Sequence, residues 1–306
     1  MITEKDALAA IDELRTCRDF LRFGETCLRR GEVFHGHGFD DPWDEVLQLL
    51  LHVLHLPHDS DPRLLDARLL RSEREALVAL LRKRVNERVP TPYLTGEAWF
   101  CGLPFKVNEQ VLIPRSPIAE LIENNFQPWL TDEPQRLLDL CTGSGCIAIA
   151  LAHAFPYADV DASDLSEAAL AVAQENVERH GLAEQVSLFQ GDGLEAVASV
   201  AAANGGYDLI VSNPPYVDAE DMASLPQEYR HEPSLALESG ADGLDFTRQL
   251  LARAADFLNP GGLLVVEVGN SAPALEAAFP QLPFTWLEFE RGGDGVFLLT
   301  REQLAD

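Results

Sequence analysis

The sequence of 306 residues has no apolar stretch long enough to span a bilayer. Its longest apolar run, Cys146–Phe155, covers ten residues and is interrupted by His153, whereas a membrane-spanning helix needs about 20 apolar residues. The N-terminal MITEKDALAA lacks a basic region followed by an apolar core, so we expect no secretory signal. We therefore expect no membrane partner.

Cysteine is also scarce, and the five cysteines form an odd set without a CxxC pair. This usage predicts reduced thiols in a cytoplasmic protein. Two of them follow a predicted strand at the start of a helix, where a thiol pKa is lowered, but no histidine stands directly beside them. We interpret them as buried thiols rather than nucleophiles. The cysteines are Cys17, Cys27, Cys101, Cys141 and Cys146.

Basic residues are few: 23 Lys and Arg stand against 50 Asp and Glu, a net charge of −27. Residues 1–90 hold 14 basic against 17 acidic residues, and residues 91–306 hold 9 against 33. Such a field opposes binding to phosphates, so we expect no nucleic acid to be bound directly. It would attract a basic protein partner, although solubility or adaptation to salt explains the charge equally well.

Histidines are unevenly placed, since five of the eight fall between residues 35 and 58. His52 and His55 are three residues apart on a predicted helix, a spacing that two metal ligands can use. No cysteine or close third ligand accompanies them, so we predict helix packing and no metal site. The clustered histidines are His35, His37, His52, His55 and His58.

The length suits one large domain and a smaller one. In residues 1–90, the segments 44–56 and 72–89 carry apolar residues at helical spacing, which predicts a helical N-terminal domain. Ser72 with Glu75 three residues later predicts a capping box at the start of the second helix.

The helical spacing of apolar residues ends at Pro90 and Pro92. Residues 91–117 are rich in aromatic and β-branched residues broken by glycines, which predicts a β-hairpin linker. From residue 118 to 306, strands alternate with helices such as 166–180 and 245–258, which predicts a mostly parallel α/β sheet. The last two strands have only a turn between them, so we expect a terminal antiparallel hairpin. The predicted strands are 136–141, 159–164, 186–190, 208–212, 263–268, 285–289 and 296–300.

The first of these strands leads into LLDLCTGSGCIAIALA. Gly143 and Gly145 permit a tight turn and close approach of a ligand, with a helix starting at once. With Ala148 they match G-x-G-x-x-A, a weak signal for NAD or FAD. Asp164, at the end of the second strand, is suited to accept hydrogen bonds from ribose hydroxyls of either a dinucleotide or an S-adenosyl nucleoside.

Two further acids favour S-adenosylmethionine. Asp139 lies just before the turn, where it can hold an ammonium group and would repel a pyrophosphate. Asp192, in the Gly191-Asp192-Gly193 segment after the third strand, can accept the exocyclic amine of adenine. Each could be an ordinary acid at a strand end, but their placement at successive carboxyl ends of a parallel sheet points to a ligand.

The fourth strand ends in Asn213-Pro214-Pro215-Tyr216. Two prolines exclude helix and further strand pairing, so the segment is rigid and extended. The Asn213 side-chain oxygen and the Pro214 carbonyl can each accept one hydrogen of an –NH2 group. The Tyr216 ring can pack over a planar substrate and favour positive charge on its nitrogen. These features predict methyl transfer to a conjugated nitrogen by orientation and preorganised electrostatics.

With these motifs the chain resembles the Class I S-adenosylmethionine-dependent methyltransferases, and over its whole length the protein-(glutamine) methyltransferases. The resemblance implies a seven-stranded Rossmann-like sheet ending in an antiparallel hairpin, preceded by a small helical substrate-docking domain and a β-hairpin linker. It also implies a cofactor site and a methylated glutamine amide. The cofactor-binding residues expected are Asp139, Cys141, Thr142, Gly143, Ser144, Gly145, Asp164, Asp192, Gly193 and Asn213, and the catalytic ones Asn213, Pro214, Pro215 and Tyr216.

Within this family, the segments Glu97-Ala-Trp-Phe-Cys-Gly102 and His37-Gly38…Asp41-Pro42-Trp43-Asp44-Glu45 resemble the ribosomal-protein branch, and other positions depart from the release-factor branch. Arg115 is followed by Ser116-Pro117-Ile118-Ala119 instead of Pro-Asp-Thr-Glu, and Cys141 replaces a glycine. Gly193 stands where the release-factor enzymes often carry an aromatic residue near adenine. The resemblance implies a basic large-subunit ribosomal protein, "L three", as substrate, methylated before or during ribosome assembly. A release factor, adenine in DNA, or a purely binding role in ribosome assembly remain the alternatives.

Overall fold

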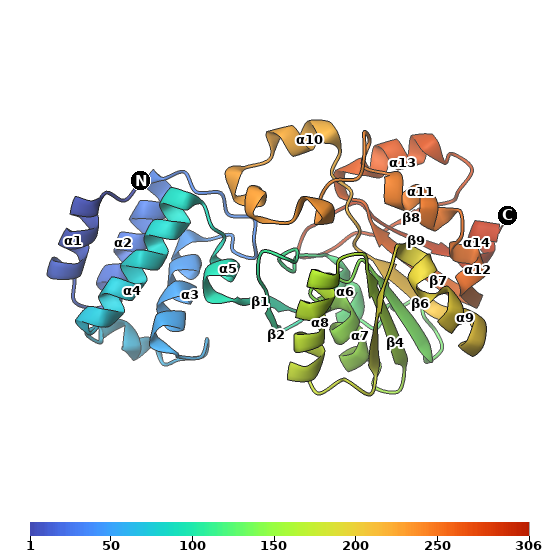
Figure 1. Cartoon of the computed structure of the whole chain (residues 1–306), viewed down its shortest axis with the longest axis horizontal. Coiled ribbons are helices and arrows are strands. Elements are labelled where there is room, and N and C mark those ends of the chain that lie inside the picture. Colours follow the sequence, from blue (N-terminus) through green and yellow to red (C-terminus); the bar gives the residue numbers. More distant parts are fainter. Residues whose placement is uncertain (306) are drawn as a thin grey trace. The chain divides into compact units, whose positions relative to one another are not determined.

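The computed structural model describes residues 1–305, which divide into two compact units (Figure 1). The first unit consists of Met1–Glu97 together with Pro226–His231. The second consists of Ala98–Leu225 and of the chain from Glu232 onward. A short segment late in the sequence therefore belongs to the N-terminal unit. None of the helices within residues 1–305 combines the length and apolarity needed to cross a membrane.

The first unit is helical, as its apolar spacing predicts. Thr3 and Thr16 each accept a hydrogen bond from the backbone N–H three residues later and cap the first two helices. Asp41 caps the third helix, with Pro42 at its first turn. Apolar side chains such as Phe20, Leu49 and Leu77 form one buried core. The helices are α1 (Glu4–Glu13), α2 (Cys17–Arg30), α3 (Pro42–Leu54), η1 (Pro62–Asp66), α4 (Arg71–Arg82), η2 (Lys83–Glu87), α5 (Thr91–Thr95) and, from the later segment, η4 (Gln227–His231).

The capping box predicted at Ser72 and Glu75 is wrong. Helix α4 begins one residue earlier, and its N-terminal backbone N–H, that of Leu70, donates to the Glu73 carboxylate at 2.7 Å. Glu75 instead accepts a hydrogen bond from Arg71 at 2.8 Å, an i,i+4 pair on the exposed face. Leucine has no side-chain acceptor, so the carboxylate in the first turn does the capping, which the Ser-x-x-Glu pattern does not reveal.

The second unit contains a seven-stranded sheet in the order β5-β4-β3-β6-β7-β9-β8. Strands β3 to β7 pair in parallel, and β9 pairs antiparallel with β7 and β8, so the predicted sheet with its terminal hairpin is confirmed. A separate two-stranded sheet joins β1 and β2. The strands are β1 (Glu97–Phe100), β2 (Leu103–Lys106), β3 (Arg136–Leu140), β4 (Asp159–Asp164), β5 (Val186–Gln190), β6 (Tyr207–Ser212), β7 (Leu258–Glu267), β8 (Thr285–Trp286) and β9 (Val296–Thr300).

Helices cover both faces of this sheet. The predicted helix over 245–258 is wrong in its length, because Arg253 leaves the helical region (φ −133°, ψ −16°) and separates two shorter helices. The helical segments are α6 (Ile118–Glu123), α7 (Cys146–Ala154), α8 (Glu167–Arg179), η3 (Gly193–Val197), α9 (Ala198–Asn204), α10 (Ala219–Ser224), η5 (Ser234–Ala236), α11 (Asp245–Leu251), α12 (Ala254–Phe257), η6 (Gly269–Ser271), α13 (Ala272–Ala278) and α14 (Arg301–Ala305).

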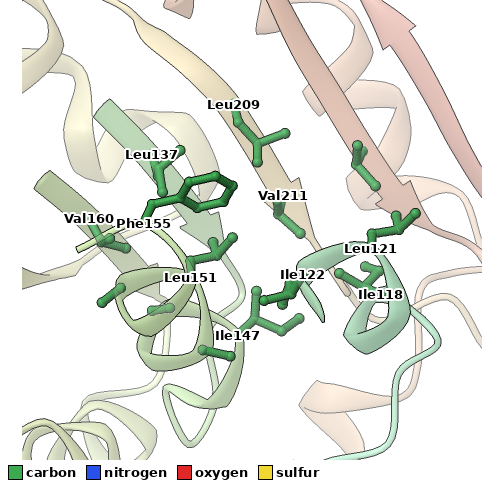
Figure 2. Packing of buried hydrophobic residues seen from close by; sticks show 14 of the residues in the cluster. Ile118, Leu121, Ile122, Leu137, Ile147, Leu151, Phe155, Val160, Leu209 and Val211 are labelled. Atoms are coloured by element: carbon green, nitrogen blue, oxygen red, sulfur yellow. The ribbon is translucent and has the colours of Figure 1, made fainter. Parts of the chain in front are cut away.

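Alternate residues of the central strands face the two helical layers, as the two-residue repeat of a strand requires. On one face, Leu137, Leu209 and Val211 pack with side chains of α6 and α7, among them Ile122 and Leu151 (Figure 2). The residues in between belong to the core of the other face, together with side chains of α11, α12 and α13. Burial on both faces explains why these strands have nearly continuous apolar sequences.

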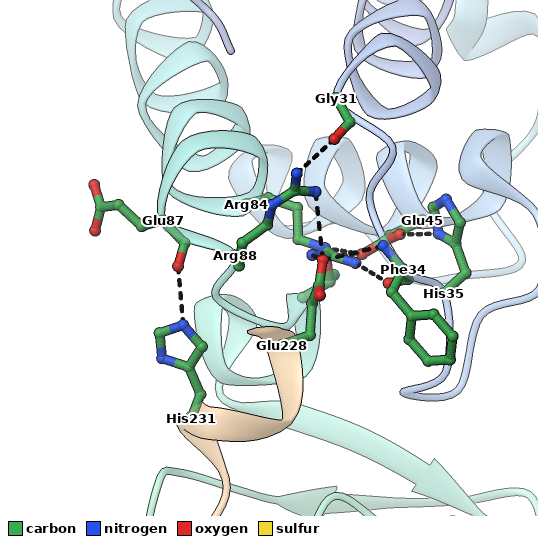
Figure 3. A network of polar contacts seen from close by, with 10 residues as sticks. Gly31, Phe34, His35, Glu45, Arg84, Glu87, Arg88, Glu228 and His231 are labelled. Carbon is green, nitrogen blue, oxygen red and sulfur yellow. Dashed lines mark hydrogen bonds and ion pairs between the residues drawn. The ribbon is translucent and has the colours of Figure 1, made fainter. Parts of the chain in front are cut away.

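A buried ionic network crosses the first unit (Figure 3). The Arg84 guanidinium donates to Glu45 at 2.5 Å and to the Phe34 carbonyl at 2.7 Å, and it lies 3.4 Å from Glu228 of the η4 segment. Arg84, Glu45 and Glu228 are at most 3% exposed. Burial by itself would raise the pKa of Glu45, but His35, which lies within hydrogen-bond distance, and Arg84 outweigh it, so that this pKa is lowered. The network therefore ties the η4 segment to α3 and η2 by charge.

Arg84→Ala should lower the free energy of unfolding of the first unit by about 3–5 kcal/mol, because it removes the buried cation that Glu45 and Glu228 share. Arg82→Ala is the matched control: its partner Glu4 is 68% exposed, so the loss should stay below about 1 kcal/mol. Amide hydrogen exchange of α3 and α4 in the full-length protein measures both. Equal exchange rates in the two variants would contradict the role given to the network.

Candidate active site

The glycine-rich loop after β3 turns through left-handed backbone. Cys141, Gly143 and Gly145 have φ values of 59°, 54° and 80°. Left-handed backbone is costly for a residue with a Cβ, so Cys141 is held in a conformation that glycine adopts more easily. The Gly143 N–H donates to the Asp164 carboxylate at 2.9 Å, so the loop is fixed against the end of β4.

A cavity of about 280 Å³ opens beside this loop in the second unit. Its lining comes from the carboxyl ends of the strands and from the segment that follows β6. Among the predicted site residues, those in the lining are Cys141, Gly143, Asp164, Asp192, Gly193, Asn213 and Pro215. The predicted residues outside the lining are Asp139, Thr142, Ser144, Gly145, Pro214 and Tyr216.

Asp139 lies beneath the loop and is fully buried. One carboxylate oxygen accepts from the Thr142 hydroxyl at 2.6 Å and from the Ala148 N–H at 3.0 Å, and the other has no hydrogen-bond partner among residues 1–305. Burial raises the pKa of Asp139 to about 7. In this structure Asp139 holds the loop to the start of α7, and its second oxygen is available to a cationic group.

Two acids at the next strand ends do face the cavity. Asp164 accepts from the backbone N–H of Gly143 and of Ser166, while burial raises its pKa. Asp192 follows β5 and lies in the lining. Ser163, which the sequence analysis did not single out, also lines the cavity, and its buried hydroxyl has no protein partner within the described part of the chain.

The cysteines of the loop are not activated. Burial raises the pKa of the Cys141 thiol well above its ordinary value and that of the Cys146 thiol to about 12. Both thiols are therefore protonated at neutral pH and are poor nucleophiles. Desolvation here outweighs any effect of the helix N-terminus.

The segment after β6 brings an unpaired acceptor to the cavity wall. The side-chain oxygen of Asn213 is buried and makes no hydrogen bond within residues 1–305. The preceding Ser212 hydroxyl donates to the Leu140 carbonyl at 2.9 Å, which fixes the start of the segment to β3. A buried amide oxygen without a partner costs free energy unless something binds it, so Asn213 is poised to accept a hydrogen bond.

Tyr216 is held from several sides. Its hydroxyl donates to Glu267 at the end of β7 at 2.9 Å, and its carbonyl accepts from the Ser271 hydroxyl at 2.9 Å. A Cβ on Gly269 would lie 2.7 Å from the Tyr216 ring, and one on Gly243 would lie 2.2 Å from its carbonyl oxygen. Only glycine allows this close packing, so the ring has little freedom.

Phe246 is an aromatic residue of the site that the sequence analysis missed. It is the second residue of α11, lines the cavity and lies 3.4 Å from the position a Cβ of Gly193 would occupy. Gly193 has a φ of 51°, which disfavours any larger residue there. Phe246 thus supplies an aromatic face next to Asp192 from a distant part of the chain, where no local pattern could reveal it.

Arg115 forms a structural ion pair instead of reaching the cavity. Its guanidinium donates to both oxygens of Glu232 at 2.6 and 2.7 Å, and Glu232 also accepts from the Ile113 N–H.

No group of three His, Cys, Asp or Glu side chains suited to a metal ion occurs among residues 1–305.

The cavity fits S-adenosylmethionine chemically. In its lining, acidic Asp164 suits ribose hydroxyls, and Asp192 with Phe246 suits a flat amino-bearing base. Asp139, outside the lining, has an unpaired carboxylate oxygen of the kind that an ammonium group requires. The acids disfavour a pyrophosphate, which the NAD or FAD alternative would require. The Asn213 side-chain oxygen at the cavity wall is left without a hydrogen-bond partner among residues 1–305.

Comparison with known proteins agrees with this fit. The family model described as "Methyltransferase small domain" matches residues 121–282. A protein of Neisseria gonorrhoeae named ribosomal protein uL3 glutamine methyltransferase is 52% identical over 298 residues, which cover 96% of this chain and 97% of that protein. A protein of Bordetella pertussis with the same name is 50% identical over 294 residues, which cover 95% and 97%.

Among solved structures, the catalytic domain of hMettl16 in complex with a MAT2A 3′UTR hairpin has the same fold, with a TM-score of 0.50 at 16% identity. That likeness covers 78% of this chain and 83% of the other. The loop, the strand-end acids, the NPPY segment and the similarity over nearly the whole chain lead to one conclusion. The chain belongs to the methyltransferase small domain family and, within it, to the ribosomal protein uL3 glutamine methyltransferases.

Proposed function

We propose that this protein transfers a methyl group from S-adenosylmethionine to the side-chain amide nitrogen of a glutamine in the large-subunit ribosomal protein uL3, the "L three" of the sequence analysis. The buried, unpartnered oxygen of Asn213 at the cavity wall is the observation that carries the proposal. Two relatives of this protein, about 50% identical to it, are named ribosomal protein uL3 glutamine methyltransferase. An amide –NH2 offers the two donors that Asn213 and the Pro214 carbonyl can accept.

The chemistry needs orientation more than a strong base. S-adenosylmethionine supplies an electrophilic methyl group when bound. An amide nitrogen is a weak nucleophile because its lone pair is delocalised, so Asn213 and Pro214 must fix it in line with the methyl group. Pro214 and Pro215 keep both acceptors still, and Tyr216 favours the positive charge that develops on nitrogen. The proton can leave after the methyl has arrived.

Cofactor binding is assigned to the residues that line the cavity and to the loop beneath. Asp164 accepts the ribose hydroxyls, Asp192 accepts the adenine amine and Phe246 packs on the base. Asp139 contributes its free oxygen to the ammonium group, and with Thr142 it holds the loop. Cys141, Gly143, Ser144, Gly145 and Gly193 shape the backbone around the cofactor.

A basic substrate has the opposite charge to the acidic part of this chain, since residues 91–306 hold 33 acidic against 9 basic residues. A basic ribosomal protein would be attracted by this field. In this proposal the helical N-terminal domain over 1–90 docks the substrate, the hairpin linker over 91–117 connects it, and residues 118–306 carry out catalysis. The reaction takes place in the cytoplasm on free or assembling uL3, a reducing setting that suits the five free cysteines.

Mass spectrometry after incubation with methyl-labelled S-adenosylmethionine tests the substrate. Free uL3, a release factor and a DNA duplex are compared, and we expect one labelled glutamine in uL3 alone. Label on the release factor would support glutamine methylation but contradict uL3 as the substrate. Label on DNA would overturn both, as would binding of S-adenosylmethionine with no transfer to any of the three.

Asn213→Ala should lower kcat for uL3 by roughly 10²–10³-fold, the loss typical of removing one preorganised hydrogen-bonding group at a reacting centre. The affinity for S-adenosylmethionine, measured by titration calorimetry, should change much less. Asn204→Ala, on the exposed end of α9, is the control and should behave as the unmodified protein. Full activity of Asn213→Ala would remove this residue from the mechanism.

Phe246→Ala should weaken S-adenosylmethionine binding by roughly tenfold or more, since stacking of a base on an aromatic ring contributes about 1–3 kcal/mol. Phe246→Tyr keeps the ring and should bind normally. At saturating cofactor the kcat of both variants should stay close to that of the unmodified protein. Equal dissociation constants for the Ala and Tyr variants would refute the assignment of the adenine contact.

A further inference from the structure

We infer that Glu267 is a positioning residue for methyl transfer: it holds the Tyr216 ring through its hydroxyl and, when ionised, puts a negative charge behind that ring. The inference rests on the proposed function and deepens it, because it assigns to the reaction a residue outside every motif of the sequence.

The sheet register brings Glu267 to the level of the NPPY segment. Ser212 of β6 pairs with Val266 of β7, and the strands are parallel, so the next residues, Asn213 and Glu267, follow at the same level. Glu267 is the last residue of β7 and pairs with Val296 of β9, whereas Asn213 lies just beyond β6. Glu267 is 4% exposed. Glu267 thus lies at the carboxyl end of β7, the edge of the sheet outside which ligands bind in folds of this kind.

Both oxygens of Glu267 are engaged by hydroxyl groups. The Tyr216 hydroxyl donates to one oxygen at 2.9 Å and the Ser116 hydroxyl lies 2.5 Å from the other. Ser116 belongs to the segment that departs from the release-factor branch. The three side chains come from positions 116, 216 and 267 and so connect the segment before α6, the NPPY segment and β7.

This hydrogen bond completes the restraint on Tyr216. Gly269 packs on the ring, and Gly243 and Ser271 meet the carbonyl. These contacts restrain the face of the Tyr216 ring and the Tyr216 backbone, whereas Glu267 binds the hydroxyl at the end of the side chain. A ring restrained at both ends can present a fixed face to the substrate.

The surroundings of Glu267 place its titration near neutral pH. Its pKa is raised to about 7, chiefly by burial and to a smaller extent by the nearby Asp294 charge. The Ser116 and Tyr216 hydroxyls and the Arg115 charge act in the opposite direction, although Arg115 is itself paired with Glu232. Glu267 is therefore ionised above this pH and neutral below it.

Ionisation changes what Tyr216 can do. A carboxylate accepts the phenol proton more strongly than a neutral carboxyl group, and this increases electron density on the ring. An electron-rich ring attracts positive charge better, and positive charge develops on the substrate nitrogen during transfer. Rate should thus rise as the pH increases through about 7, the pKa of Glu267.

Kinetics of Glu267→Gln, Tyr216→Phe and the double variant test the inference. Glutamine keeps the shape and one acceptor but cannot carry charge. We expect kcat for uL3 to fall roughly 10–100-fold in each single variant, as for loss of a hydrogen bond to a charged group. The double variant should be no slower than the slower single one, because both act through one contact. The rise of kcat near neutral pH should flatten in Glu267→Gln.

A second measurement needs no cofactor. Selective ¹³C labelling of the phenol carbons gives few resonances, since the chain has five tyrosines, and Tyr216→Phe assigns the one of interest. We expect the Tyr216 resonance to titrate with a midpoint near 7, as Glu267 does, and this titration to be absent in Glu267→Gln. Asp139→Asn is the control, because the pKa of Asp139 is also about 7, and the titration should persist in that variant.

The outcomes separate this inference from the proposed function. If the unmodified protein methylates uL3 and Glu267→Gln is equally active with an unchanged pH profile, the inference fails and the function stands. If the unmodified protein does not methylate uL3 but the Tyr216 resonance titrates as described, the function fails and the contact stands. Should Glu267→Gln unfold, Tyr216→Phe and Ser116→Ala provide the same comparison, and normal kcat with normal pH profiles in both would overturn the inference.

Discussion

The parallel alignment of β3, β4 and β6 is the constraint on which the rest of the structure depends. Leu140 pairs with both Ser163 and Ser212, so the three strands end at one level. The glycine loop, Asp164 and the NPPY segment leave the sheet together at that edge. A slip of one residue would turn the apolar side chains of β6 to the wrong face, so burial of the core and assembly of the site enforce the same register.

Two sets of buried polar groups differ in how their hydrogen bonds are satisfied. In the first unit, Arg84 is matched by Glu45 and Glu228, so the charges are neutralised inside the protein. At the edge of the sheet, oxygens of Asp139 and Asn213 find no partner within residues 1–305. Since native interiors seldom leave polar atoms unsatisfied, the first arrangement indicates a structural role and the second a place for a ligand.

The chain between β6 and β7 serves both units. It begins with Asn213 at the cavity, contributes residues 226–231 to the first unit, and returns at Glu232, which fixes Arg115. It then adds Phe246 to the lining of the cavity. One continuous segment thus contains the NPPY motif, an element of the first unit and an aromatic residue of the cavity lining.

The sequence by itself determined the sheet, the glycine loop and the NPPY segment, because these depend on local chemistry: short apolar strands alternating with helices, glycines at a turn and prolines after a strand. Only the tertiary structure decided which side chains meet. Phe246 reaches Gly193, and Glu267 reaches Tyr216 and Ser116, across separations that no local pattern records. The predicted capping box of α4 was wrong for a related reason. The Ser72 and Glu75 pattern predicted the cap there, whereas the Leu70 N–H donates to the Glu73 carboxylate. Periodicity and turn chemistry are properties of neighbours in the chain, whereas pairing of buried polar groups is a property of neighbours in space.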